Sequence, residues 1–350
     1  MVKISNMKAT YSQLLLNFKQ ASGTSRGILK QKETWFIKLE TPEKWGIGEC
    51  GMLRGLSCDD RPDYEEKLQW VCDHIGLGFD ALYAEINEFP SIQMGLETAF
   101  ISLASDDPFC LFPSKFTNSK DTLPINGLIW MGDHAFMLSQ LEQKLAAGFN
   151  CIKMKVGAID FDQELALLKT IRQRFSKDEI VLRVDANGAF SAEEAPSKLD
   201  ALAAFDIHSI EQPLMPEQWE SMAALCKNTP LPIALDEELI GVFGSSQKQQ
   251  LLDMINPQYI ILKPSFVGGF RGSQEWIKLA NERQIGWWVT SALESNIGLN
   301  AITQWTYTLN PKGPQGLGTG SLYTNNIHSP LVVEKGYIGY DNTKKWSTIQ

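Results

Sequence analysis

Three acidic residues follow short apolar segments of the chain at nearly equal intervals. Asp185, Glu211 and Asp236 each lie at the end of a run rich in valine, isoleucine or leucine, and they are 26 and 25 residues apart. Each acid alone has an ordinary explanation, because Asp and Glu often cap helices or hold turns. Three converging carboxylates would repel one another unless a proton or a cation neutralised them. Such an all-oxygen set, with room for water, suits Mg²⁺, and Mn²⁺ would also be accepted.

Basic side chains accompany these acids. Lys153 and Lys155 are two residues apart, so on a strand they point to the same face, and Lys263 ends a later apolar run. A lysine pair on a strand is often a solvated edge, whereas an ammonium inside a barrel requires an ionic or functional partner. Cations nearby would lower the pKa of a lysine and allow it to act as a general base. Two further polar residues that could orient an anionic substrate or support it by hydrogen bonding are Arg183 and Asn187.

Short strands, one every 25–30 residues, must position these side chains. The apolar runs end near Lys155, Asp185, Glu211, Asp236, Lys263 and Ser291. A βα unit occupies about this length, and residues 124–130 and 314–319 provide a first and an eighth strand. Eight such units predict a closed parallel barrel with its active site at the carboxyl ends of the strands. An open doubly wound sheet is disfavoured, because no Gly-x-Gly-x-x-Gly follows the first strand.

The first 110 residues do not follow this rhythm. Residues 11–18 and 34–40 are predicted antiparallel strands joined by a flexible polar loop at 20–27, and residues 62–105 are helical in character. Strands followed by helices indicate a separate α+β domain. We therefore expect a capping domain at 1–115, completed by about 325–350, and a barrel domain at 120–320. The capping domain is either a packing partner or a lid over the barrel.

Composition limits the class of protein. A net charge of −9 argues against a nucleic-acid partner, which would need clustered Lys and Arg. The sequence has no apolar run long enough to span a membrane and no signal-peptide core at its start. Its six cysteines are scattered without a Cys-x-x-Cys pair, as is typical of reduced thiols. These features predict a cytoplasmic globular protein of undetermined oligomeric state.

The complete motif set resembles the enolase superfamily, in its muconate-lactonising-enzyme-like branch. The matching motifs are Lys-Met-Lys ending at Lys155, Asp-Ala-Asn from Asp185, Glu-Gln-Pro from Glu211, Asp-Glu from Asp236 and Lys-Pro from Lys263. The resemblance covers nearly the whole chain and implies an α/β fold, a modified (β/α) TIM-type barrel with an N-terminal α+β capping domain. It also implies Mg²⁺ bound by the three acids, with Lys155 and Lys263 flanking a small carboxylate substrate. The reaction type implied is proton abstraction next to a carboxylate, through an enediolate.

The same resemblance indicates which residues contact the substrate. Two loops of the capping domain, around residues 22–26 and 50–53, would help to set specificity. The predicted substrate-binding residues are Lys153, Arg183, Asn187, Ser291, Ser22, Arg26 and Met52.

Differences within the superfamily narrow the activity. Thr290 and Ser291 stand where mandelate-racemase-like members place a histidine, and residues 316–320 lack the Asp-x-Asp of dipeptide epimerases. The segment Ser-Ala-Leu-Glu-Ser at 291–295 is similar to that of o-succinylbenzoate synthases, which implies a dehydratase of menaquinone biosynthesis, a carbon–oxygen lyase. N-Succinylamino acid racemase, or another cycloisomerase or epimerase of the superfamily, is the alternative. Two other classes stay open, a Schiff-base aldolase and a non-catalytic metal-binding relative.

Overall fold

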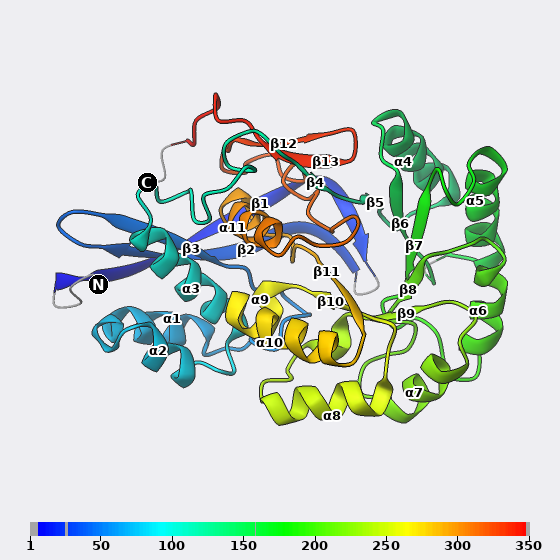
Figure 1. Ribbon diagram of the computed structural model, residues 1–350, viewed down its shortest axis with the longest axis horizontal. Coiled ribbons are helices and arrows are strands. Elements are labelled where there is room, and N and C mark those ends of the chain that lie inside the picture. The colour runs from blue at the N-terminus through cyan, green and yellow to red at the C-terminus, as the bar shows by residue number, and fades with distance from the viewer. Residues whose placement is uncertain (1–5, 25–26, 158, 348–350) are drawn as a thin grey trace.

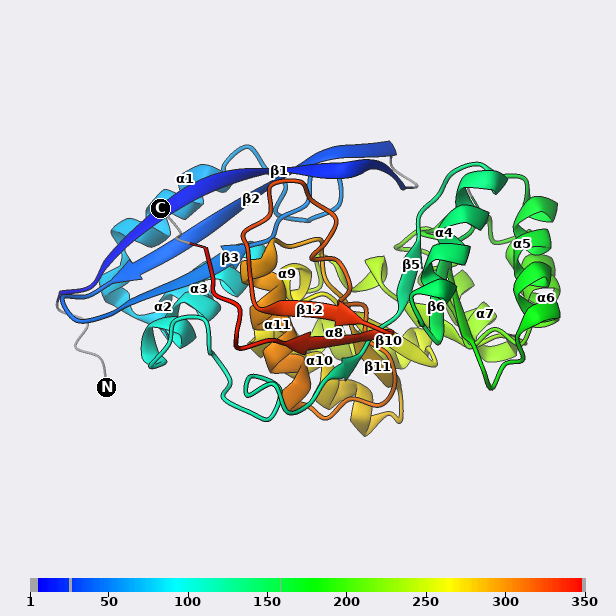
Figure 2. The ribbon, with the colours of Figure 1, turned by 90° about the horizontal axis from the view of Figure 1, so that it is seen from above.

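The structure, a computed structural model, describes residues 6–24, 27–157 and 159–347 of the 350-residue chain. Its N-terminal part is a three-stranded antiparallel sheet, in the order β1 (Lys8–Thr24), β2 (Gly27–Glu40) and β3 (Trp45–Cys50). The helices that follow are α1 (Tyr64–Asp73), η2 (Ile75–Leu77), α2 (Phe79–Glu85) and α3 (Pro90–Ala104). Figure 2 shows these helices packed on one face of the sheet. The predicted order of strands and then helices is confirmed.

Glycines allow helix α3 to lie directly on strand β3. A Cβ atom at Gly48 would stand 1.9 Å from the carbonyl oxygen of Gly95 and 2.2 Å from Thr98 Oγ1. A Cβ at Gly46 would be 2.3 Å from the backbone nitrogen of Leu103. The Gly-x-Gly pattern of β3 is therefore a packing requirement of the N-terminal domain.

The polar loop predicted at residues 20–27 is mostly strand. Ser22 pairs with Leu29 and Thr24 with Gly27, after a break in register that follows Asn17. The strands continue because each backbone finds its partner across the hairpin, whatever the local polarity of the side chains. Arg26 lies outside the described residues. The far end of this hairpin extends over the barrel (Figures 1 and 2).

Seven parallel strands form the barrel sheet, in the order β11–β10–β9–β8–β7–β6–β5. They are β5 (Gly127–Ile129), β6 (Cys151–Lys155), β7 (Val181–Asp185), β8 (Ser209–Glu211), β9 (Ile233–Leu235), β10 (Tyr259–Leu262) and β11 (Gly286–Val289). The helices between and after them are α4 (His134–Ala146), α5 (Phe161–Arg174), α6 (Ala195–Ala203), α7 (Trp219–Asn228), η3 (Glu237–Leu239), α8 (Ser245–Ile255), α9 (Pro264–Val267), α10 (Gly269–Glu282) and α11 (Asn296–Thr308). Figure 1 shows α4 to α8 outside the curved sheet.

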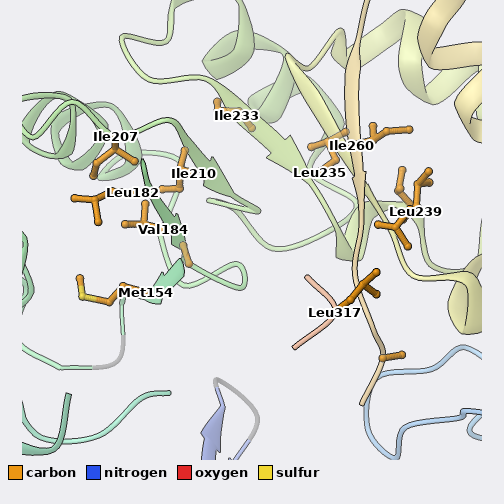
Figure 3. Packing of buried hydrophobic residues seen from close by; sticks show 14 of the residues in the cluster. Met154, Leu182, Val184, Ile207, Ile210, Ile233, Leu235, Leu239, Ile260 and Leu317 are labelled. Carbon is orange, nitrogen blue, oxygen red and sulfur yellow. The ribbon is translucent and has the colours of Figure 1, made fainter. Parts of the chain in front are cut away.

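Alternation along the strands separates the packing face from the barrel interior. In β7, Leu182 and Val184 pack with Ile210 of β8 in the hydrophobic cluster of Figure 3. Arg183 and Asp185 are on the opposite face of the strand, inside the barrel. Both faces of the strand are buried, as expected for a parallel sheet covered by helices.

The predicted eighth strand is wrong as a regular element, because residues 314–319 make only isolated contacts with the sheet. Gln315 forms a single parallel bridge with Ile125, and Gly316 forms one with Thr290. The amide of Gly316 donates to the carbonyl of Val289 at 2.8 Å. A Cβ at Gly316 would stand 2.4 Å from Thr290 Oγ1, so only glycine allows this approach. Two backbone bridges therefore close the barrel where a strand was expected. The first strand is also shorter than predicted.

The C-terminal part forms a small antiparallel sheet next to the amino end of strand β6, where Gly336 lies against Phe149 and Asn150. Strands β12 (Leu331–Glu334) and β13 (Tyr337–Tyr340) pair with β4 (Leu123–Pro124), the element that begins the barrel region. The chain contacts the N-terminal domain on both sides of this sheet. Before it, the amide of Thr324 donates to the carbonyl of Asn17 in β1 at 2.9 Å, and after it Trp346 stacks on Phe109 at 4.3 Å. No helix in the described part of the chain is long and apolar enough to cross a membrane.

Candidate active site

Three acids lie at one rim of the barrel, as their spacing predicts. Asp185 and Glu211 are the last residues of β7 and β8 and are paired directly across the two strands. Asp236 follows the last residue of β9. All three are buried, at 0–2% exposed. The parallel register of adjacent strands brings these side chains together.

Lysines separate the three carboxylates. Lys153 Nζ lies 2.7 Å from Asp185 Oδ2 and 2.5 Å from Glu211 Oε2. Lys155 Nζ, from the end of the same strand, is 2.5 Å from Asp185 Oδ2. Lys263, directly after β10, forms an ion pair with Asp236. The rim is thus an alternating array of buried carboxylates and buried or partly buried ammonium groups, which compensate charges that would be costly alone.

Asn187 connects this array to the following loop. Its backbone nitrogen donates to Asp185 Oδ1 at 3.0 Å, and its side-chain oxygen accepts from Lys155 Nζ at 2.5 Å. Its amide nitrogen donates to Glu237 Oε1 at 2.8 Å. The φ angle of Asn187 is 45°, in the left-handed region that asparagine tolerates better than most residues. Asn187 therefore orients the ammonium of Lys155.

Charge interactions shift the ionisation of the rim. Burial raises the pKa of Glu211, and the charge of Asp185 raises it further. Burial opposes ionisation of Asp185 and Asp236 as well, but the neighbouring lysines outweigh it and lower both pKa values. Burial lowers the pKa of Lys263, yet Asp236 and other acids outweigh burial and the net shift is upward. The expected lowering of a lysine pKa is therefore not found for Lys263, because carboxylates are its nearest charges.

The donor set fits a divalent cation such as Mg²⁺. Asp185, Glu211 and Asp236 offer only oxygen atoms, the ligands that Mg²⁺ prefers. Glu211 Oε1 is buried without a hydrogen-bond partner among the described residues. A dication there would remove the repulsion that raises the pKa of Glu211. In this conformation the three carboxylates face lysines. Residues 6–24, 27–157 and 159–347 contain no group of three or more Asp, Glu, His or Cys side chains that are close enough together to hold a metal ion.

A cavity of about 250 Å³ opens above this rim. Lys153, Lys155, Asn187, Glu237 and Lys263 form its polar floor. The N-terminal domain contributes Ile28 and Leu29 from the β1–β2 hairpin, and Leu53, Arg54 and Leu56 from the next loop. Thr290, Ser291 and Thr319 supply hydroxyl groups from the barrel. A small anionic molecule with an apolar body matches this lining, since apolar walls and a few polar groups are typical of small-molecule sites.

Two predicted substrate contacts lie elsewhere. Arg183 is one layer deeper in the barrel than Asp185, where it donates to the carbonyl of Pro314 at 2.9 Å and stacks 4.1 Å from the ring of Trp288. Met52 is fully buried in the core of the N-terminal domain, and its neighbour Leu53 lines the cavity. Sharing a strand face does not mean sharing a depth, because residues two apart are about 6.6 Å apart along a strand.

The other predicted contacts divide between the cavity and the hairpin. Lys153, Asn187 and Ser291 line the cavity. Ser22 is placed by its backbone in strand β1, and Arg26 lies outside the described residues.

Sequence reasoning missed two acids. Glu237 lines the cavity beside Asp236, and the Asp-Glu pair was its only signal. Glu294 accepts from the hydroxyl of Ser291 at 2.7 Å and lies inside the segment 291–295. The motif was visible, but the direction of each side chain depends on the fold.

Comparisons with known proteins identify the family. The profile of the family "Enolase C-terminal domain-like" matches residues 137–343. An o-succinylbenzoate synthase of Desulfotalea psychrophila (strain LSv54 / DSM 12343) is 46% identical over 96% of this chain and 100% of the relative. An N-succinylamino acid racemase of Amycolatopsis sp. is 23% identical over 90% and 87% of the two chains.

A solved structure with a similar sequence also has a similar fold. The crystal structure of MenC from Desulfotalea psychrophila LSv54 has a TM-score of 0.85 and 44% sequence identity, and covers 96% of this chain and 100% of that one. The present chain contains the capping sheet, the curled parallel sheet and the rim residues described above. The chain therefore belongs to the enolase superfamily.

Proposed function

We propose that this protein is a dehydratase that forms o-succinylbenzoate from 2-succinyl-6-hydroxy-2,4-cyclohexadiene-1-carboxylate, a step of menaquinone biosynthesis. The observation that carries the proposal is the position of Lys155 and Lys263. They come from β6 and from the end of β10, and both line the cavity above the three carboxylates. The name and 46% identity of the Desulfotalea psychrophila relative support this choice of substrate.

Lys155 is the proposed acid–base residue. In its neutral form it would remove the ring proton next to the substrate carboxylate, and the resulting ammonium would then protonate the departing hydroxyl group. One proton and one hydroxide leave as water, and the ring becomes aromatic. Asn187 and Asp185 hold the ammonium in place through contacts of 2.5 Å each. A lysine positioned in this way contributes roughly 10²- to 10⁴-fold to the rate.

Lys263 is proposed to act by its charge. The ion pair with Asp236 holds its ammonium at the cavity wall. A fixed positive charge in a buried site stabilises negative charge that develops on the substrate carboxylate. Asp185, Glu211 and Asp236 are the proposed ligands of Mg²⁺, with Mn²⁺ as a substitute. When bound, the metal ion would supply Lewis-acid stabilisation of that same charge, worth several kcal/mol.

Racemisation of N-succinyl amino acids is the second candidate function. It requires proton transfer on both faces of the substrate, and the cavity has a lysine from each of two separated strands. The similarity to the Amycolatopsis sp. racemase favours the same candidate.

Turnover of the two substrates by the Mg²⁺-loaded protein tests the choice. Formation of o-succinylbenzoate, followed by its aromatic absorbance, supports the dehydratase. Efficient racemisation of N-succinyl amino acids without dehydration would assign the chain to the second function.

We also propose a cytoplasmic location, supported by six cysteines that form no disulfide.

A further inference from the structure

A buried polar cluster joins the N-terminal sheet to the barrel beside the cavity. Its charged members are Lys32 of β2, Glu49 of β3, and Glu294 in the loop between β11 and α11, all at most 3% exposed. Lys32 Nζ has no hydrogen-bond partner among the described residues, although both carboxylates act on its charge. Burial lowers the pKa of Lys32, and the two acids oppose that shift. The cluster therefore contains one cation for two buried anions.

Glu49 is fully occupied by hydrogen bonds from neighbouring groups. Its Oε1 accepts from Thr34 Oγ1 at 2.7 Å and from the amide of Ser295 at 2.8 Å. Its Oε2 accepts from Ser295 Oγ at 2.5 Å and from the amide of Gly298 at 2.8 Å. Glu49 of the N-terminal sheet thus caps helix α11 of the barrel domain, and this contact holds the two domains together.

Glu294 instead contacts a serine that lines the cavity, Ser291. Its Oε2 accepts from Ser291 Oγ at 2.7 Å, and its Oε1 accepts from Ser265 Oγ at 2.6 Å. Ser291 Oγ in turn accepts from Thr319 Oγ1 at 2.8 Å and from the amide of Leu293 at 2.9 Å. The result is a chain of hydroxyl groups that runs from Thr319 through Ser291 to Glu294.

The direction of this chain follows from the charge of Glu294. An ionised carboxylate has no proton, so Ser291 must donate to it and must accept from Thr319. The single hydroxyl proton of Thr319 is then donated to Ser291 within the cavity wall. Thr319 and Ser291 both line the cavity. Towards a ligand, Thr319 can therefore offer only lone pairs.

Lys32 supports that direction. The pKa of Glu294 is raised because burial opposes its ionisation, and the charge of Lys32 together with the hydroxyl groups of Ser265 and Ser291 counters that rise. A protonated Glu294 could donate to Ser291, and the chain could then run outward, with Thr319 donating into the cavity. The lysine on β2 thereby affects a hydroxyl group on the far side of the domain interface.

We propose that Lys32 and Glu294 are positioning residues, which orient Ser291 and Thr319 so that this wall accepts hydrogen bonds from the substrate and does not donate them. The inference rests on the proposed dehydration. That substrate carries one hydroxyl group, a donor, beside carboxylates that only accept. The wall would bind the hydroxyl side of the substrate, and it would lose this contact when water leaves. Thr319 would then favour the substrate over the product.

A double-mutant cycle tests the proposal. Thr319→Val, which removes the accepting oxygen, should raise KM for the hydroxylated substrate about tenfold and leave the inhibition constant of o-succinylbenzoate within twofold. Lys32→Met should raise KM similarly, with kcat within threefold, and Lys32→Arg should restore it. In the Thr319→Val background, Lys32→Met should have no further effect, because the two residues act through one chain.

Three controls make the outcome decisive. Lys38→Met changes a lysine of the same strand that pairs with Glu40 at the surface, and it should alter neither constant. If Lys32→Met does not fold, Glu294→Gln replaces it in the cycle. The inference is overturned, while the proposed function stands, if wild-type turnover is normal and the Lys32 or Glu294 substitution has the same effect in the wild-type and the Thr319→Val backgrounds. Absence of wild-type dehydration would instead overturn the proposed function.

Discussion

Lys155 and Asp185 form a partly buried ion pair between neighbouring strands, with Lys155 Nζ 2.5 Å from Asp185 Oδ2. The two residues are direct partners in the β6–β7 register. The proposed acid–base residue and a proposed metal ligand are thus held by the same pair of strands. A change at either residue should therefore disturb the other, and the predictions for the site follow from this coupling.

Metal removal is expected to abolish dehydration. Asp185→Asn, Glu211→Gln and Asp236→Asn should each weaken Mg²⁺ binding and reduce turnover by at least about 100-fold, because each removes a charge that compensates the ion. Calorimetric titration with Mg²⁺ and turnover before and after EDTA treatment measure both effects. Mg²⁺ or Mn²⁺ should restore the wild type. Full activity in excess EDTA after dialysis would contradict the proposed metal site.

The two lysines should respond differently to substitution. Lys155→Ala is expected to lower kcat for dehydration by roughly 10²- to 10⁴-fold, the contribution of a positioned acid–base group. Lys263→Arg keeps the positive charge near Asp236 and should retain measurable turnover. Near-normal dehydration by Lys155→Ala would exclude the proposed mechanism.

Hydrogen exchange distinguishes the second function. In D₂O, a racemising wild type should exchange the α-proton of both enantiomers of an N-succinyl amino acid, which NMR detects. Lys155→Ala and Lys263→Ala should each lose exchange with one enantiomer, because each lysine serves one face. Loss of both exchanges in either variant would show that the lysines do not act on separate faces.

Glu97 should make stability depend on pH. This residue of α3 accepts from the amides of Phe270, at 2.6 Å, and Arg271 across the domain interface, and burial raises its pKa to about 7. The folded state then binds more protons than the unfolded state above pH 4.5, so stability should fall as pH rises from about 5 to 7. The loss is roughly 2–3 kcal/mol. Urea unfolding at pH 5 and pH 8 should show a smaller difference for Glu97→Gln, and an unchanged difference would exclude this role.

The contact between β3 and α3 should tolerate no side chain at Gly48. Gly48→Ala would place a Cβ 1.9 Å from the carbonyl of Gly95, and we expect it to lower the unfolding free energy by about 3 kcal/mol or more. Gly76→Ala is the matched control, since nothing lies within 4 Å of its Cβ position. Denaturant unfolding of both variants measures the difference. Equal stability of the two would contradict the packing argument.

The spacing of residues along the sequence was sufficient to predict the barrel and its rim. Apolar runs recurring every 25–30 residues predict βα units, and parallel strands necessarily bring their carboxyl ends to one side. For this reason the convergence of Asp185, Glu211, Asp236 and the three lysines could be expected before the structure was known. Asp160 caps helix α5, with its side chain accepting from the amide of Gln163, and such a contact depends only on neighbours in sequence.

Relations between distant segments required the tertiary structure. Residues 314–319 resemble a strand, but they close the barrel with two bridges because glycine allows a close approach to Thr290. Arg183 shares a face with Asp185, yet the stacking on Trp288 holds it below the cavity. Lys32, Glu49 and Glu294 have no common motif, since they lie on separate elements up to 262 residues apart. Their burial and charge balance arise only when the N-terminal sheet docks on the barrel, because desolvation depends on what covers a residue and not on its sequence neighbours.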